Sequence, residues 1–175
     1  MDQNTQEIPK FTSRHLRDMF GLFPTGVAIV TAVTPDASYL AATVSSFSTV
    51  SLDPPLILFS MARSSKSFEG WSAVSAFAVN ILSEDQRTLS SQFAQSVGEK
   101  WQGVEPEIAA HSGLPLIPGA LGTFQCRTWA KYDGGDHLII VGEIFEMSRS
   151  EAGRPLIFSG SRYSKLAEEA FANII

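Results

Sequence analysis

The chain has 175 residues, of which 44% are hydrophobic and 18% are charged, and its formal net charge is −5 at pH 7. This length and composition predict one globular domain and exclude an intrinsically disordered chain. The acidic balance, without a long basic run, argues against nucleic acid as the main partner, and no apolar run approaches the roughly 20 residues that span a membrane.

The first ten residues, "MDQNTQEIPK", are polar and lack the apolar centre of a signal peptide. We therefore expect a flexible arm over residues 1–10, one domain over 11–175, and a cytoplasmic protein. The single cysteine, Cys126, cannot form an internal disulfide, which suits a reducing compartment. Its strand-like surroundings predict a small buried apolar side chain.

A helix is predicted from Thr12 or Ser13 onward, because apolar residues recur after it with the spacing of one helical face. The β-branched stretch 23–34 predicts a strand that ends at the turn signal "PDAS". A second strand is predicted over 39–49 and is stopped by Pro54 and Pro55, which cannot continue a ladder. Two further apolar strands are predicted over 56–61 and 76–82.

In the second half of the chain, Ser83 and Gln86 have the spacing of a capping box, which opens a helix with Leu89 and Phe93 on one side. Residues 99–119 are expected to form a loop. The remaining predicted elements are strands at 120–132 and 137–147 around the turn "DGGD", a strand at 154–160 and a helix at 164–175.

At least six strands joined mostly by tight turns favour an antiparallel β-barrel with peripheral α-helices over a doubly wound sheet. No G-x-G-x-x-G follows the first predicted strand, so a Rossmann nucleotide site is not expected. No G-x-S-x-G is present, which disfavours a serine hydrolase. His15, His111 and His137 are far apart in sequence and have no cysteine partners, so no structural zinc site is predicted.

The stretch "MARSSKSF" (61–68) gathers Arg63, Lys66 and three serines just before a predicted helix. A helix start exposes unpaired amides and favours anions, so a phosphate site is one interpretation. The alternative is that Ser64 or Ser65 caps the helix while both cations are solvated.

Two other stretches carry possible functions. "AATVSSFSTVSLDPP" (41–55) is rich in small and hydroxylated residues, which let a flat ligand approach the backbone. An ordinary edge strand with polar residues facing water explains it equally well. "GGDH" (134–137) places His137 beside a glycine-rich turn, where an exposed or structurally bonded histidine is the simpler interpretation.

Taken together and in this order, these features resemble the short-chain flavin reductase family, whose members adopt the FMN-binding split barrel, an antiparallel barrel of Greek-key type. Many relatives are the small component of two-component monooxygenases. The resemblance covers residues 16 to 166 and is carried by "FPTGVAIVTA", "TVSSFSTVSLDPPLILFSMARSSKSF", "FAVNILSEDQ", "GLPLIPGALGTFQC", "YDGGDHLIIVGEI" and "RPLIFSGSRYSKL".

The resemblance implies roles for individual residues in binding FAD or FMN and NADH. The isoalloxazine ring would be lined by Ala42, Thr43, Val44, Ser45, Ser46 and Phe47. The ribityl chain would follow Ser60, Met61 and Ala62, the flavin phosphate would bind Lys66 and Ser67, and Phe93 would lie near the outer part of the flavin. The nicotinamide nucleotide would contact His137, with Arg162 and Tyr163 nearby.

The implied function is that of an NADH-dependent flavin reductase, a homodimer that supplies reduced flavin to a separate monooxygenase. NADPH is less favoured, since no basic pair is evident for its 2′-phosphate. Trp101, in "EKWQG", replaces a phenylalanine common in relatives, so FAD and FMN both stay open. The alternatives are a flavin-binding protein without turnover, and an interaction domain that uses 16–23 and "FANII".

Overall fold

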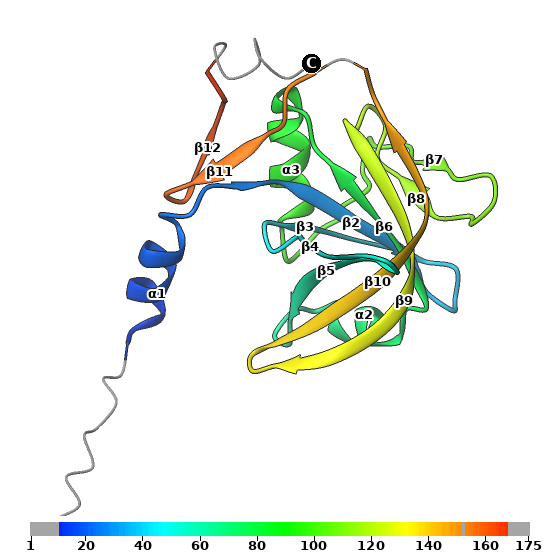
Figure 1. Cartoon of the computed structure of the whole chain (residues 1–175), viewed down its shortest axis with the longest axis horizontal. Coiled ribbons are helices and arrows are strands. Elements are labelled where there is room, and N and C mark those ends of the chain that lie inside the picture. The colour runs from blue at the N-terminus through cyan, green and yellow to red at the C-terminus, as the bar shows by residue number, and fades with distance from the viewer. Residues whose placement is uncertain (1–10, 152, 168–175) are drawn as a thin grey trace, which may run out of the picture.

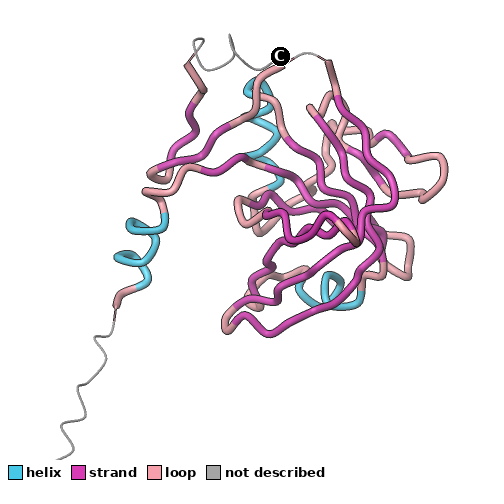
Figure 2. The backbone as a smooth tube through the Cα atoms, viewed as in Figure 1, coloured by secondary structure: helices cyan, strands magenta, loops and turns pink. Residues whose placement is uncertain are grey.

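The computed structural model describes residues 11–151 and 153–167, and its backbone consists mainly of strands, with short helices at the periphery (Figures 1 and 2). The predicted arm over 1–10 lies outside the described residues. The elements in chain order are α1 (Ser13–Phe20), β1 (Thr25–Gly26), β2 (Ala28–Val33), β3 (Tyr39–Val44), β4 (Ser48–Leu52), β5 (Pro55–Ala62), α2 (Phe68–Ala73), β6 (Ala76–Ile81), η1 (Glu84–Gln86, a 3₁₀ turn), α3 (Arg87–Phe93), β7 (Glu107–Ile108), β8 (Pro115–Leu116), β9 (Gly122–Gly134), β10 (His137–Arg149), β11 (Ile157–Ser159) and β12 (Arg162–Ser164).

Seven strands form one curved sheet in the order β3-β2-β6-β9-β10-β5-β4, and every neighbouring pair is antiparallel. The longest strands, β9 and β10, form a hairpin at the predicted "DGGD" turn (Figure 1). Two small sheets, β1-β11-β12 and β7-β8, flank it. The prediction of a mainly β, antiparallel split-barrel fold with peripheral helices is confirmed.

The strand predicted over 39–49 is in fact two strands at opposite edges of the sheet. β3 ends at Val44 and β4 begins at Ser48, so residues 45–47 cross from one edge strand to the other. β-Propensity is similar on both sides of this crossing, which is why the sequence pattern missed it. Pro55, expected to lie outside the ladder, is the first residue of β5 and pairs with Leu52. Proline is tolerated at that strand position.

The predicted first helix is confirmed as α1, with Thr12 as its N-cap: the His15 amide donates to the Thr12 hydroxyl at 3.2 Å. None of its residues is buried, and it extends away from the sheet (Figure 1). Met19 and Phe20 are 63% and 70% exposed, so its apolar face has no partner among the described residues.

The core consists of two clusters of buried side chains. The first cluster consists of side chains of the curved sheet and α2, and it includes the aromatic rings of Phe59, Trp71 and Phe77, each 0% exposed. The second packs α3 against the sheet and contains Phe93 of α3 together with Ile29 and Leu82, among others. Burial of this apolar surface is the main force that holds the sheet and α3 together.

The predicted capping box of Ser83 and Gln86 is confirmed at the start of η1, where the Ser83 amide donates to Gln86 Oε1 at 3.0 Å, and η1 continues into α3. The helix predicted from residue 164 is wrong over 164–167: Ser164 ends β12, and 165–167 have no regular structure. Its remainder lies outside the described residues. None of the helices in the described part of the chain has the length and hydropathy needed to traverse a bilayer.

Candidate functional site

An open groove of about 480 Å³ lies where the β3–β4 crossing meets the end of β5 and the segment after α3. Its described lining contains small, hydroxylated and cationic side chains, and none of these residues is acidic. The lining consists of Ala42, Thr43, Val44, Ser45, Ser46, Ser60, Met61, Ala62, Ser64, Ser65, Lys66, Ser67, Phe93, Ala94, Gln95, Ser96, Lys100 and His137. Most of the residues predicted from the sequence are therefore brought together here.

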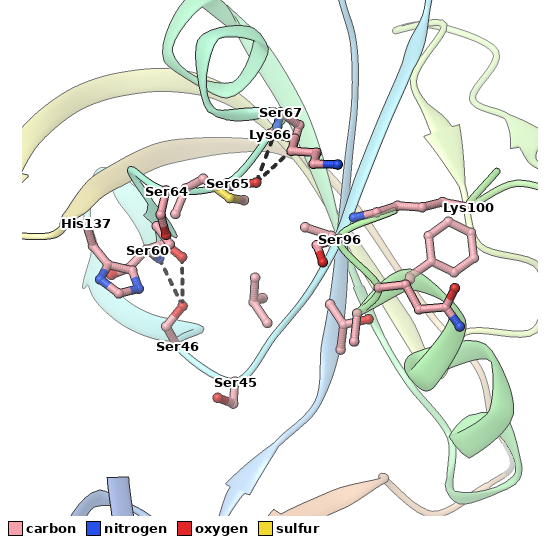
Figure 3. A pocket seen from close by; sticks show the side chains of 18 residues that line it. Ser45, Ser46, Ser60, Ser64, Ser65, Lys66, Ser67, Ser96, Lys100 and His137 are labelled. Atoms are coloured by element: carbon pink, nitrogen blue, oxygen red, sulfur yellow. Dashed lines mark hydrogen bonds between the residues drawn. The ribbon is translucent and has the colours of Figure 1, made fainter. Parts of the chain in front are cut away.

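One wall is the crossing segment 45–47, which is attached to β5 by Ser46. The Ser60 amide donates to Ser46 Oγ at 3.0 Å, and that hydroxyl lies 3.4 Å from the Ser60 carbonyl oxygen (Figure 3). Within the described residues, the amides of segment 45–47 donate no hydrogen bond. This wall therefore offers unpaired backbone donors to a ligand that accepts hydrogen bonds.

The loop between β5 and α2 forms the next part of the rim. The Ser65 and Ser67 hydroxyls lie 3.1 Å apart, and Ser67 is the N-cap residue of α2, in place of Ser64 or Ser65. Lys66 is exposed, and no hydrogen bond or ion pair joins its side chain to the described residues. Free cations and hydroxyls next to one another form a suitable site for a phosphate.

Arg63 does not belong to this site, although the sequence suggested that it did. Its amide donates to the Asp136 carbonyl at 2.9 Å, and its Nε donates to the Gly135 carbonyl at 3.0 Å. Its guanidinium pairs with Asp133 at 2.7 Å, and this hydrogen bond lowers the pKa of Asp133. Arg63 thus binds the β5–α2 loop to the turn of the β9–β10 hairpin.

His137 enters the groove from that hairpin, because it pairs with Ala62 at the end of β5. Its Nδ1 lies 2.7 Å from Asp136 Oδ1, and this hydrogen bond lowers the pKa of Asp136. The imidazole is 42% exposed, so a ligand in the groove can reach it. Figure 3 shows His137 and Lys100 on opposite sides of the groove.

Sequence reasoning missed Lys100 and the segment 94–96. Lys100 is half-buried, its Nζ donates to the Ala41 carbonyl at 2.9 Å, and burial lowers the pKa of its ammonium. The one motif noted near Lys100 in the sequence was "EKWQG", and it drew attention to Trp101 and not to the lysine. Trp101 does not line the groove; it packs edge-on against Phe93, with the ring centroids 4.9 Å apart. Trp101 therefore supports the Phe93 wall from behind.

Three predicted residues lie outside the groove. Phe47 turns toward the core and stacks on Phe124, with ring centroids 6.0 Å apart. Arg162 is exposed on β12 and lines no described cavity. Tyr163 lines a second cavity of about 180 Å³ that shares Thr43, Val44, Ser45 and Ala94 with the groove. Its hydroxyl lies 2.9 Å from Ser90 Oγ.

No described set of His, Cys, Asp or Glu side chains is grouped as metal ligands would be. Cys126 is buried as predicted, and burial raises the pKa of its thiol to about 12. It is therefore neither a ligand nor a nucleophile at neutral pH. The groove offers hydrogen-bond donors, cations and one imidazole, which suit binding and orientation rather than acid–base or nucleophilic chemistry.

Residues 20–167 match the family described as flavin reductase like domain. The chain belongs to this family. It is 43% identical over 157 residues to the FMN reductase (NADH) SmoA of Agrobacterium fabrum, covering 90% of this chain and 88% of that protein. The matched region includes every residue that lines the groove.

Two further relatives extend the comparison. The chain is 39% identical over 131 residues to the reductase component of the flavin-dependent trigonelline monooxygenase of Acinetobacter baylyi. That match covers 75% of this chain and 42% of the relative, so the chain spans less than half of the relative's length. The NADH:FAD oxidoreductase SgcE6 of Streptomyces globisporus, solved in complex with NAD and FAD fragments, superimposes with a TM-score of 0.85. It is 34% identical, and the match covers 94% of this chain and 99% of SgcE6.

Proposed function

We propose that the chain is an NADH-dependent flavin reductase that transfers hydride to FAD or FMN and delivers the reduced flavin to a separate monooxygenase component. The observation that carries the proposal is the groove itself. Among the described residues, its lining joins unpaired amides, a lysine without a partner and an accessible histidine and contains no acidic side chain, in a member of the flavin reductase-like family.

The residues present fit a phosphorylated flat heterocycle. We assign the ring to the wall formed by 42–46, the chain between ring and phosphate to Ser60, Met61 and Ala62, and the phosphate to Lys66 and Ser67. When bound, the flavin supplies the acceptor for the hydride of NADH. The amides of 45–47 would donate to the polar edge of the ring and favour added negative charge there.

The remaining task of the chain is to orient two planar substrates. Correct placement converts a bimolecular reaction into an effectively unimolecular one, so positioning alone supplies much of the acceleration. His137 would hold the nicotinamide nucleotide at the side of the groove opposite Lys100. A site that binds and orients its two substrates needs neither a metal cluster nor an activated nucleophile, and the described residues contain neither.

The decisive experiment mixes the purified chain with NADH and with FAD, FMN or neither, and follows the absorbance of NADH. We expect oxidation of NADH that depends on added flavin, and slower oxidation with NADPH. If no flavin supports oxidation of either nicotinamide, the chain is not a reductase. Tight flavin binding without turnover would instead identify a flavin-binding protein.

Replacing Lys66 with methionine should weaken FMN and FAD binding about tenfold, or ~1.4 kcal/mol, by removing a charge-assisted hydrogen bond to phosphate. The effect stays at the low end of such interactions because Lys66 is exposed. Riboflavin, which has no phosphate, should bind both proteins equally. Fluorescence titration measures all three affinities, and an unchanged affinity for FMN would remove Lys66 from the phosphate site.

Replacing His137 with alanine should raise the KM for NADH about three- to tenfold, the effect of losing one ordinary hydrogen bond, and leave flavin affinity unchanged. Steady-state kinetics at saturating flavin measures this change. His111→Ala is the matched control, because that histidine is exposed on the surface and does not line the groove. A variant with an unchanged KM would show that His137 has no role in nicotinamide binding.

We further propose that the protein is a cytoplasmic homodimer. In support of the dimer, several large apolar side chains are exposed on the described surface, and the apolar face of α1 has no partner among the described residues. They include Met19, Phe20, Phe23, Leu52 and Met147. Light scattering on the eluting protein measures its mass, and a monomer at micromolar concentration would contradict the assembly.

A further inference from the structure

The groove contains a second lysine that the function described above does not use. Within the described part of the chain, Lys100 Nζ donates one hydrogen bond, to the Ala41 carbonyl at 2.9 Å. An ammonium group has three N–H donors, so two remain beside this contact. In the close-up, the ammonium groups of Lys66 and Lys100 extend toward the same end of the groove, where Ser96 also lies (Figure 3).

This end of the groove favours negatively charged ligands. The chain as a whole carries a net charge of −5, yet its described groove lining holds two lysines and no carboxylate. The two lysines come from different parts of the fold, Lys66 from the β5–α2 loop and Lys100 from the segment after α3. An ammonium is a compact point charge, so lysines on facing walls suit a ligand with two neighbouring phosphate groups.

Lys100 is also held in a way that favours a specific contact. Its stem is half-buried and its one carbonyl partner fixes it beside β3, so less conformational entropy is lost when a ligand binds. The burial that lowers the pKa of its ammonium also strengthens an interaction with an anion, because water screens it less.

We propose that Lys100 binds the second phosphate of a flavin dinucleotide, while Lys66 binds the phosphate that FAD and FMN share. The groove then selects FAD over FMN, and Lys100 is the residue that makes the distinction. This inference rests on the proposed function and deepens it by naming the class of flavin.

The test compares riboflavin, FMN and FAD, which carry no, one and two phosphates, in direct binding titrations by flavin or tryptophan fluorescence. Lys100→Met should raise the Kd of FAD about tenfold, the usual cost of losing one charge-assisted hydrogen bond. The Kd values of FMN and riboflavin should stay within about twofold of those of the wild-type protein. Lys100→Arg, which keeps the charge, should retain most of the preference for FAD.

Lys131→Met is the matched control. Lys131 is also half-buried, donates to the Ser72 and Val74 carbonyls at 2.6 and 2.9 Å, and has a pKa lowered by burial, but it does not line the groove. Its replacement should leave all three flavin affinities unchanged. Thermal unfolding of each variant checks that it is folded, and Lys100→Gln replaces Lys100→Met if the latter does not fold.

Equal weakening of FAD and FMN would place Lys100 on the shared phosphate and overturn the proposal. Unchanged affinity for every flavin would overturn it too, including the case in which only the KM for NADH rises and Lys100 serves the nicotinamide nucleotide. Failure of the wild-type protein to bind any of the three flavins would contradict the proposed function instead. Different observations would therefore contradict the role of Lys100 and the proposed reductase function.

Discussion

Replacing Phe59 with alanine is expected to lower the free energy of unfolding by about 3–5 kcal/mol, the usual cost of removing a fully buried aromatic ring. Phe59 is 0% exposed at the centre of β5. Its ring meets Trp71 and Phe77 edge-on, with centroid distances of 5.4 and 5.1 Å. Its removal would leave a cavity under the strand that carries Ser60, Met61 and Ala62.

Equilibrium unfolding in urea measures this change. Phe145→Ala is a suitable control, because Phe145 is 40% exposed and should cost about 1 kcal/mol or less. A loss below 2 kcal/mol in Phe59→Ala would mean that the neighbouring rings collapse into the space. If the cavity in Phe59→Ala lets the end of β5 move, the affinity for flavin should fall together with the stability. If β5 keeps its position, the affinity for flavin should be unchanged.

Replacing Asn80 with leucine is expected to cost about 3 kcal/mol of stability, because each buried polar group left unpaired costs roughly 1–3 kcal/mol. Asn80 is 0% exposed on β6. Its amide donates to the Ile29 carbonyl at 2.9 Å and to Thr31 Oγ1 at 3.2 Å, and it accepts from the Ile117 amide at 2.9 Å. Leucine is similar in size but satisfies none of these partners.

Thermal and urea unfolding measure the effect, with Thr49→Val on the exposed edge strand β4 expected to stay within about 0.5 kcal/mol of the wild-type protein. The flavin affinity of folded Asn80→Leu should be unchanged, because Asn80 does not line the groove. If Asn80→Leu were as stable as the wild-type protein, the hydrogen bonds of Asn80 with Ile29, Thr31 and Ile117 would contribute nothing to stability.

Sequence patterns correctly predicted the elements that are determined by residues close together in the chain. The capping residue Thr12 and the "DGGD" turn were found because the residues that cause these features are neighbours in sequence. The crossing at 45–47 was missed because its cause is the placement of β3 and β4 at opposite edges of the sheet. Strand propensity carries no information about that arrangement.

The same distinction separates the site residues found from those missed. Segments 42–46, 60–62 and 66–67 were assigned through the family resemblance, which rests on contiguous motifs, and the structure brings all three to one groove. The sequence offered Arg63 as one possible part of an anion site, because its side-chain partners, Gly135 and Asp133, lie 72 and 70 residues away in sequence and gave no local signal. Lys100 belongs to a loop without periodicity, so nothing near it indicated where its side chain would lie.

The attachment made by Arg63 has a consequence for how the two substrates sense each other. Arg63 joins the loop that bears Lys66 to the turn beside His137 through both its amide and its guanidinium, in addition to the pairing of β5 with β10, so we expect a shift of either segment to affect the position of the other. If binding of the first substrate shifts the loop or the turn that it contacts, the second substrate binds to a site whose geometry has changed. Thermodynamic reciprocity then requires each substrate to change the affinity of the other by the same factor.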